Sequence, residues 1–249
     1  MINNKVKVVS TFITAGSQGF EEDAVAFNSE KGIFIVSGGF GGPTAGKKVA
    51  EISCEGVKEF LEHEGGDLDA TLPFVLRKYY SLSGNIVFNS ILHANQKIYS
   101  YNKDKNVHEK GGSSLVAAYL EGDLLSLANV GVTTAWLVRN GSIRQLIYPR
   151  SYGWLLDPFN KVSDQKTVHS VPLMSLGTTQ DLEPEIIEVK IREGDWLVCQ
   201  SNGEITEFIE KIAEIQKSEL SSGKATEDVN QYLKTSQINS KLSILLAIF

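Results

Sequence analysis

The chain has 249 residues, of which 42% are hydrophobic and 22% charged, and a formal net charge of −6. This composition is typical of a soluble globular protein and excludes a mainly disordered chain. The negative charge gives no general affinity for nucleic acid or for an anionic membrane. Two cysteines, Cys54 and Cys199, are too few for a disulfide scaffold or a cysteine-based zinc site. We expect one domain over 1–249, a cytoplasmic location and no secretory leader.

The first part of the chain has the pattern of β-strands. Residues 5–14, KVKVVSTFIT, alternate as in a half-buried strand. The segment at 24–39, AVAFNSEKGIFIVSGG, contains two apolar runs joined by a Ser-Glu-Lys-Gly turn and predicts a hairpin.

A change of period then indicates helices. Apolar residues between Ala45 and His63 recur at helical spacing, with charges between them. The span 70–101 predicts further helix, interrupted near 81–84.

The second half returns to strands that are separated by tight turns. We predict hairpins at 113–131, at 133–148 and at 185–202, where the last turns at Glu193-Gly194. The second hairpin turns at Asn140-Gly141, and Asn-Gly between apolar runs is the strongest short hairpin signal because both residues tolerate a positive φ.

The C-terminal part combines helix and strand. Residues 205–216, ITEFIEKIAEIQ, predict an amphipathic helix, and 241–249, KLSILLAIF, predict a closing strand. The polar stretch at 218–231 predicts a loop between two helices. Strands in hairpins, with helices gathered in two blocks, predict an α+β fold with antiparallel sheets, since a parallel sheet needs a helix between most strands.

Two short segments are candidate sites. Gly41–Lys48 matches the P-loop pattern except at its last position, where Lys48 replaces the Ser or Thr that holds Mg²⁺. A nucleotide-binding protein is therefore an alternative function. The run Glu21-Glu22-Asp23 precedes a strand, where it is either a cation site or a solvated turn.

Five segments, taken in order, resemble the metal-dependent type 2C protein Ser/Thr phosphatases, the PPM family. The segments are GFEEDAVAF, IFIVSGGFGGPTAGKKVAE, GSSLVAAYLEGDLLSLANVGVTTAWLVRNGSIRQL, REGDWLVCQSNGEIT and SKLSILLAIF. The resemblance implies a single PPM-type phosphatase-like domain over 1–249. Its implied architecture is a four-layer α-β-β-α sandwich, with two antiparallel sheets face to face and helices outside.

The resemblance also implies a metal site, and here the chain departs from the family. Family members hold two Mn²⁺ or Mg²⁺ ions and use a metal-bound hydroxide to attack phosphate. Most family site positions carry other residues in this chain, namely Gln18, Gly38, Val132, Asn202 and Ser240. What remains of the site is Glu22, Asp23 and the carbonyl of Gly39, of which Asp23 and Gly39 are weak metal candidates.

The number of carboxylates left in the aligned site predicts whether it can bind metal ions. Hard divalent cations need several oxygen ligands, including carboxylates, and one or two carboxylates cannot hold two such ions. We therefore expect no bound metal, no cofactor and no catalytic residue, that is, a pseudophosphatase. We also form the hypothesis that Lys241 turns its ammonium toward Asp23 and acts as a cation surrogate; the alternative is that Lys241 points to solvent.

The leading interpretation is an inactive protein-binding or regulatory module in Ser/Thr phosphorylation signalling. Its expected partner is a protein, such as a Ser/Thr kinase or a phosphoprotein, and neither nucleic acid nor membrane. The alternative is an active protein Ser/Thr phosphatase with an atypical or single-metal site. A displaced carboxylate would then supply the missing ligand, with four candidates: Asp157, Asp164, Asp181 and Glu204.

Overall fold

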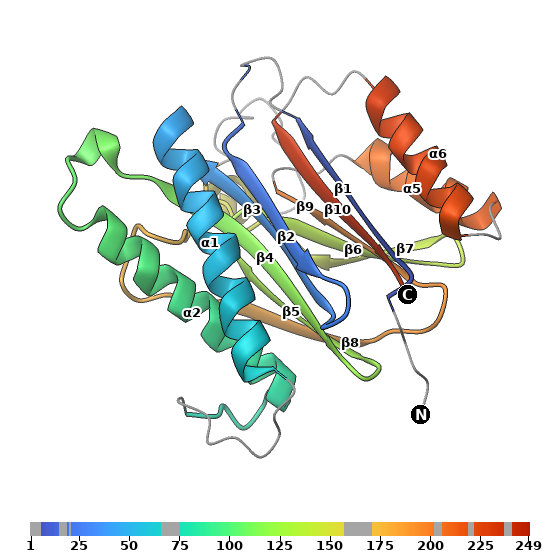
Figure 1. Ribbon diagram of the computed structural model, residues 1–249, viewed down its shortest axis with the longest axis horizontal. Helices are drawn as coiled ribbons and strands as arrows, with labels where there is room; N and C mark the ends of the chain where they lie inside the picture. The colour runs from blue at the N-terminus through green and yellow to red at the C-terminus, as the bar shows by residue number, and fades with distance from the viewer. Residues whose placement is uncertain are drawn as a thin grey trace.

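The structure is a computed structural model in which two five-stranded antiparallel sheets pack against each other (Figure 1). Strand order is β1-β10-β9-β6-β7 in sheet A and β2-β3-β4-β5-β8 in sheet B. The predicted α+β sandwich is confirmed. The residues that the structure describes are 6–14, 19, 21–65, 75–156, 171–201, 206–218, 222–236 and 241–249.

The strands are short and follow the apolar runs of the sequence. Those of sheet A are β1 (Val8–Thr14), β10 (Leu242–Ile248), β9 (Trp196–Gln200), β6 (Thr134–Arg139) and β7 (Ser142–Ile147). Those of sheet B are β2 (Asp23–Asn28), β3 (Ile33–Phe40), β4 (Gly112–Glu121), β5 (Leu124–Val130) and β8 (Glu185–Lys190).

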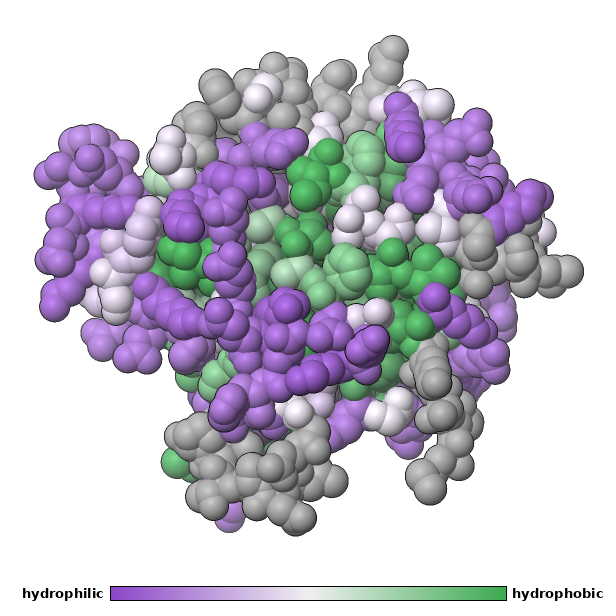
Figure 2. All heavy atoms as spheres, viewed as in Figure 1, coloured by the Kyte–Doolittle hydropathy of each residue, from purple (hydrophilic) through white to green (hydrophobic). Residues whose placement is uncertain are grey.

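Helices cover the outer face of each sheet. The longer helices are α1 (Pro43–Glu64), α2 (Leu82–Asn102), α5 (Thr206–Ser218) and α6 (Ser222–Thr235), and the short ones are η2 (Val107–Glu109) and α3 (Tyr152–Leu156). Hydrophilic residues cover the side of the molecule where α1 and α2 lie (Figure 2). None of the helices in the described ranges is long and apolar enough to cross a membrane.

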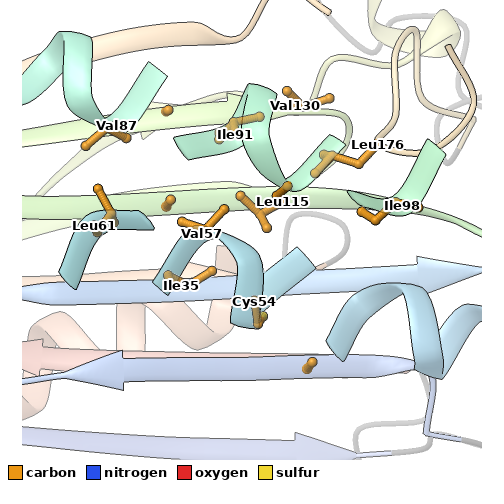
Figure 3. Close-up of a cluster of buried hydrophobic side chains, with 14 of the residues drawn as sticks. Ile35, Cys54, Val57, Leu61, Val87, Ile91, Ile98, Leu115, Val130 and Leu176 are labelled. Carbon is orange, nitrogen blue, oxygen red and sulfur yellow. The ribbon is translucent and has the colours of Figure 1, made fainter. Parts of the chain in front are cut away.

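Three buried hydrophobic clusters hold the layers together. The first packs α1 and α2 on sheet B, with Val57 and Leu61 of α1 and Ile91 of α2 over Ile35 and Leu115 (Figure 3). The second fills the space between the sheets, and the third lies between sheet A and the pair α5 and α6. Because each layer buries apolar surface on its neighbour, the four-layer order expected from the sequence follows.

Three expectations about local structure were wrong. The strands around Glu193-Gly194 do not form a hairpin, because β8 pairs with β5 in sheet B whereas β9 pairs with β6 and β10 in sheet A. The stretch at 218–231 is mostly helix α6 rather than a loop. Residues 75–80 are not helical; the interruption seen near 81–84 is the start of α2, which Ser81 caps.

The buried Asn95 side chain fastens the segment that enters β8 to helix α2. Its amide nitrogen donates to the carbonyls of Thr179 and Gln180, and its oxygen accepts from the Gly177 backbone N–H. Asn95→Ala leaves the buried Gly177 N–H without its partner and removes two part-buried hydrogen bonds, so we expect it to lower the free energy of unfolding by about 2–3 kcal/mol in urea titrations. The control is Asn89→Ala on the same helix, whose amide makes a single bond to Asn85. Equal losses in the two variants would contradict the prediction.

Candidate functional site

The candidate site lies where strand ends from the two sheets meet. In sheet B, Asp23 begins β2 and pairs in register with Gly38 of β3. In sheet A, Ser201 directly follows β9 and Lys241 directly precedes β10. The two sheets therefore bring residues about 220 positions apart in sequence into one site, as the contact between Lys241 and Glu22 shows.

Lys241 provides the positive charge of this site. Its Nζ donates to Glu22 Oε2 at 2.9 Å and to the Gly39 carbonyl at 2.7 Å, and lies 3.6 Å from Asp23 Oδ1. The hypothesis that Lys241 turns toward Asp23 required a separation under about 6 Å, and the structure meets it. The ammonium thus contacts all three groups that the sequence analysis named as the remnant of a metal site.

Asp23 is held from both sheets and is fully buried. Its Oδ2 accepts a 2.5 Å hydrogen bond from the Ser201 hydroxyl, which in turn accepts from the Ser243 backbone N–H. The Lys47 ammonium donates to the Asp23 backbone carbonyl. The interpretation of the acidic run as a solvated turn is therefore wrong for Asp23.

Burial raises the pKa of Asp23 above its ordinary value of 3.8, although the Ser201 hydrogen bond and the charge of Lys241 act in the opposite direction. A carboxyl group whose pKa is higher in the folded state stabilises the fold below pH 3.8, and this contribution is lost as the pH rises through the raised pKa. Asp23→Asn lacks this titration. We therefore expect the free energy of unfolding of Asp23→Asn to rise relative to that of the native protein as the pH increases from 4 to neutral. Urea unfolding of both proteins across this range checks it, and a stability difference that does not change with pH would contradict it.

Two glycines allow the backbone to close tightly around the site. A Cβ added at Gly38 would lie 2.8 Å from the Ser201 carbonyl oxygen, and one at Gly39 would clash with the carbonyl oxygens of Gly46 and Glu22. Since real Cβ atoms essentially never approach so closely, larger residues fit here only if the backbone shifts. Gly38 is thus part of a closely packed arrangement, with no room left for a side chain.

A pocket of about 330 Å³ opens beside Lys241. Its walls are mainly apolar and include Phe40, Val132 and Pro172, and Ser114 also lines it. Val132 is held there by a hydrogen bond from its backbone N–H to Ser114 Oγ. The pocket has the character of a binding site for an organic group, in which most of the surface is apolar and few polar groups converge.

The described residues do not fit a pair of divalent ions. No three acidic, histidine or cysteine side chains gather as a metal site in the described part of the chain. The two remaining carboxylates, of Glu22 and Asp23, already face an ammonium. A divalent ion at this position would have to displace Lys241 and would find too few oxygen ligands.

The structure brings most of the predicted site residues together. Gly38, Gly39, Val132 and Lys241 line the pocket, and Glu22 and Asp23 bind the lysine. Gln18, Asn202 and Ser240 lie outside the described residues, as do Asp157, Asp164 and Glu204 of the displaced-ligand alternative. The fourth displaced-ligand candidate, Asp181, is exposed and does not line the pocket.

The sequence analysis did not predict that two serines, Ser114 and Ser201, belong to the site. Ser201 contacts Asp23 directly and Ser114 lines the pocket, but Ser201 directly follows β9, Ser114 lies within β4, and neither serine carries a distinguishing sequence pattern. Only the adjacency of Ser201 to the degenerate position Asn202 was available as a signal.

The P-loop alternative is not supported by the backbone. Helix α1 begins at Pro43, so only Gly41 and Gly42 separate it from β3, too few residues to wrap around a phosphate. Lys47 lies within the helix and contacts the Asp23 carbonyl and Glu21. Neighbouring strands are antiparallel, whereas a P-loop follows a strand of a parallel sheet.

The fold of this chain is similar to that of several solved Ser/Thr phosphatases. One is Stp1 from Staphylococcus aureus, with a TM-score of 0.76, 16% identity and coverage of 98% of this chain and 95% of that one. The S. agalactiae Ser/Thr phosphatase has a TM-score of 0.72 and 20% identity, and the match covers 97% of this chain and 98% of that one. The catalytic domain of the Ser/Thr protein phosphatase PstP, in complex with two manganese ions, has a TM-score of 0.74 and 16% identity, and the match covers 97% of each chain. The sequence matches no protein-family model and no curated protein.

Proposed function

Since the chain has the fold of the PPM-type Ser/Thr phosphatases, we propose that it is a pseudophosphatase, a catalytically inactive protein-binding or regulatory module in Ser/Thr phosphorylation signalling. One observation carries the proposal. The Lys241 ammonium lies within 3.6 Å of Glu22, Asp23 and the Gly39 carbonyl, the groups that the resemblance places at the metal site.

The charges at the site support this proposal. Glu22 and Asp23 bring two negative charges, and Lys241 supplies one positive charge through a covalently attached cation that is always present at this position. Phosphoryl transfer in this family relies on a metal-bound hydroxide, and an ammonium cannot bind and activate a water in that way. The side chains of this site can therefore bind and orient a partner, but the described residues include none that generates the attacking nucleophile.

The pocket supports a binding role. Its apolar walls at Phe40, Val132 and Pro172 suit an apolar side chain of a protein segment. Its one ammonium is already paired with two carboxylates, so a phosphorylated segment would bring further negative charge to an acidic site. An unmodified segment of a kinase or of a kinase substrate is the partner that this chemistry favours.

The test is release of phosphate from a phosphopeptide mixture by the purified protein, with and without millimolar Mn²⁺. We expect no turnover in either condition and no saturable Mn²⁺ binding by calorimetry. Asp23→Asn is run in parallel, because any turnover that survives this substitution comes from a contaminating phosphatase. Mn²⁺-dependent turnover that Asp23→Asn abolishes would overturn the proposal.

A triple variant tests whether added carboxylates alone are sufficient for phosphatase activity. Gly38→Asp, Asn202→Asp and Ser240→Asp together return the aspartates that the resemblance implies. We expect this variant to stay inactive, because a Cβ at position 38 would lie 2.8 Å from the Ser201 carbonyl oxygen and Lys241 would still be in place. Turnover by the triple variant would show that the backbone around Gly38 opens more easily than its packing indicates.

A further inference from the structure

A second pocket, of about 400 Å³, adjoins the pocket beside Lys241. We call the first the Lys241 pocket and the second the loop pocket, because the loop at 103–111, between α2 and β4, forms much of its lining. The two pockets share Phe40, whose ring lies against Gly112 at the start of β4. In Figure 1 the loop at 103–111, in green, lies beside the start of α1, which directly follows the end of β3. A ligand in one pocket can therefore extend over Phe40 into the other.

The loop pocket is positively charged. Lys103 and Lys110 line it and are exposed, and its described lining holds no carboxylate. Neither lysine takes part in an ion pair within the described part of the chain. The two acids of the same loop, Asp104 and Glu109, do not line this pocket, and Glu109 accepts hydrogen bonds from Asn106. In a chain with a formal net charge of −6, these two ammonium groups form a local positive surface that an anionic group can complement.

Other polar groups of the loop pocket are already bonded within the fold. The Asn102 amide donates to the carbonyls of Gly111 and Gly177, and its oxygen accepts from the Gly111 N–H. The Thr178 hydroxyl donates to the Ser175 carbonyl. The two lysines are therefore the cationic donors that a ligand meets in this pocket.

On the basis of the binding role proposed above, we propose that the partner is an extended, unmodified protein segment with two recognition side chains. One is an apolar side chain in the Lys241 pocket, and the other is an aspartate or glutamate in the loop pocket. The apolar walls of the first pocket suit the apolar side chain, whereas Lys103 and Lys110 suit a carboxylate. Phe40 is 36% exposed and offers apolar surface to the part of the segment that lies between the two side chains.

Strand register sets the spacing between the two recognition side chains. Gly38 pairs with Ser114, and both line the Lys241 pocket; Phe40 pairs with Gly112, and both line the loop pocket. Two residues along a strand span about 7 Å, and side chains two positions apart in an extended chain point to the same side. We therefore expect the acidic residue of the partner two positions from its apolar residue.

The loop pocket suits a carboxylate better than a phosphate. Proteins that bind phosphorylated segments typically use clusters of arginine, whose planar fork matches the phosphate oxygens. The described lining of the loop pocket contains no arginine, and the backbone N–H groups of Lys110, Gly111 and Gly177 already donate within the fold. Glu22 and Asp23, which bind the lysine of the neighbouring pocket, also disfavour the second negative charge of a phosphate.

The first experiment is selection of binders to the purified protein from a random library of displayed peptides at low salt. We expect the selected peptides to combine an apolar residue with Asp or Glu two positions away, counted in both directions along the peptide. This combination should be at least about threefold more frequent than in the unselected library, because complementary charge favours such segments over neutral and basic ones.

A pair of substitutions removes the charge of the loop pocket. Lys103→Gln with Lys110→Gln should abolish the preference for an acidic residue and keep the preference for an apolar one, because the Lys241 pocket is unchanged. The matched control is Lys190→Gln with Lys211→Gln, which removes the same number of positive charges from exposed ion pairs outside both pockets. This control should keep both preferences.

The second experiment measures the affinity of one selected peptide by fluorescence polarisation. Glutamine in place of its acidic residue should weaken binding to the native protein at least about fivefold at low salt, and the difference should shrink as salt is added. The same replacement should leave binding to the Lys103→Gln, Lys110→Gln variant unchanged, because the charges that it addresses are gone. A peptide with phosphoserine at this position should bind no tighter than the peptide with the carboxylate.

The outcomes separate this proposal from the proposed function. Apolar binders without an acidic preference, or an acidic preference that survives in the Lys103→Gln, Lys110→Gln variant, would overturn the role of the loop pocket and leave the binding role of the Lys241 pocket standing. Tighter binding of the phosphoserine peptide would overturn the assignment of the loop pocket to a carboxylate. A library that yields no binder would instead count against the proposed binding function itself.

Discussion

Lys241→Met is expected to lower the free energy of unfolding by about 3 kcal/mol at neutral pH, since removing one partner of a buried ion pair leaves an uncompensated buried charge. The Asp23 side chain is 1% exposed and that of Glu22 is 15% exposed, so solvent replaces the lost ammonium poorly, at Asp23 above all. Methionine keeps most of the length of the lysine side chain, so the loss reports the charge and its hydrogen bonds. Urea unfolding measures the effect.

The pH dependence of this loss distinguishes charge from packing. Burial raises the pKa of Asp23, and loss of the Lys241 charge removes a group that lowers it, so protonation of Asp23 as the pH falls toward 4 removes the unpaired charge and should shrink the stability difference between Lys241→Met and the native protein. The matched control is Lys211→Met, because Lys211 forms an exposed pair with Glu214 whose loss should leave the free energy of unfolding nearly unchanged. A loss for Lys241→Met that stays constant with pH would contradict the role of Lys241 as the internal cation.

Arg139→Met is expected to cost about 3–5 kcal/mol of unfolding free energy, for the same physical reason at another place. Asp195 is 1% exposed and accepts hydrogen bonds from Arg139 Nε at 2.7 Å, from Nη2 at 2.5 Å and from the Arg192 backbone N–H at 2.7 Å. The hydrogen bonds to Asp195 raise the pKa of Arg139 above its ordinary value. The pair fastens the start of β9 to β6, close to the C-terminal Phe249, whose N–H donates to the Asp195 carbonyl.

Two comparisons test the Arg139 prediction. The double variant Arg139→Met with Asp195→Asn removes both charges and should recover part of the lost stability. Lys190→Met breaks an exposed pair with Asp123 and should change the free energy of unfolding by less than about 1 kcal/mol. If Arg139→Met is as mild as Lys190→Met, the Arg139–Asp195 pair contributes little to the fold.

The sequence by itself determined most of the elements and much of the site. Alternation and helical spacing predicted the strands and helices, and Asn140-Gly141, with φ of 51° and 75°, forms the expected turn between β6 and β7. Ordered motifs led to the correct architecture and brought attention to Glu22, Asp23, Gly39 and Lys241. These signals are local, because side-chain period and turn chemistry depend on residues close together in the chain.

Only the tertiary structure decided which strands pair and which groups meet. Local pattern marks β8 and β9 as apolar strands but does not show that they belong to different sheets. The contact of Ser201 with Asp23, and the close approach of Ser201 to Gly38, exist only because the two sheets close on each other. Periodicity indicates which face of an element is buried, whereas the partners of a residue depend on how distant segments pack. That packing brings Lys241 into contact with Glu22, Asp23 and the Gly39 carbonyl.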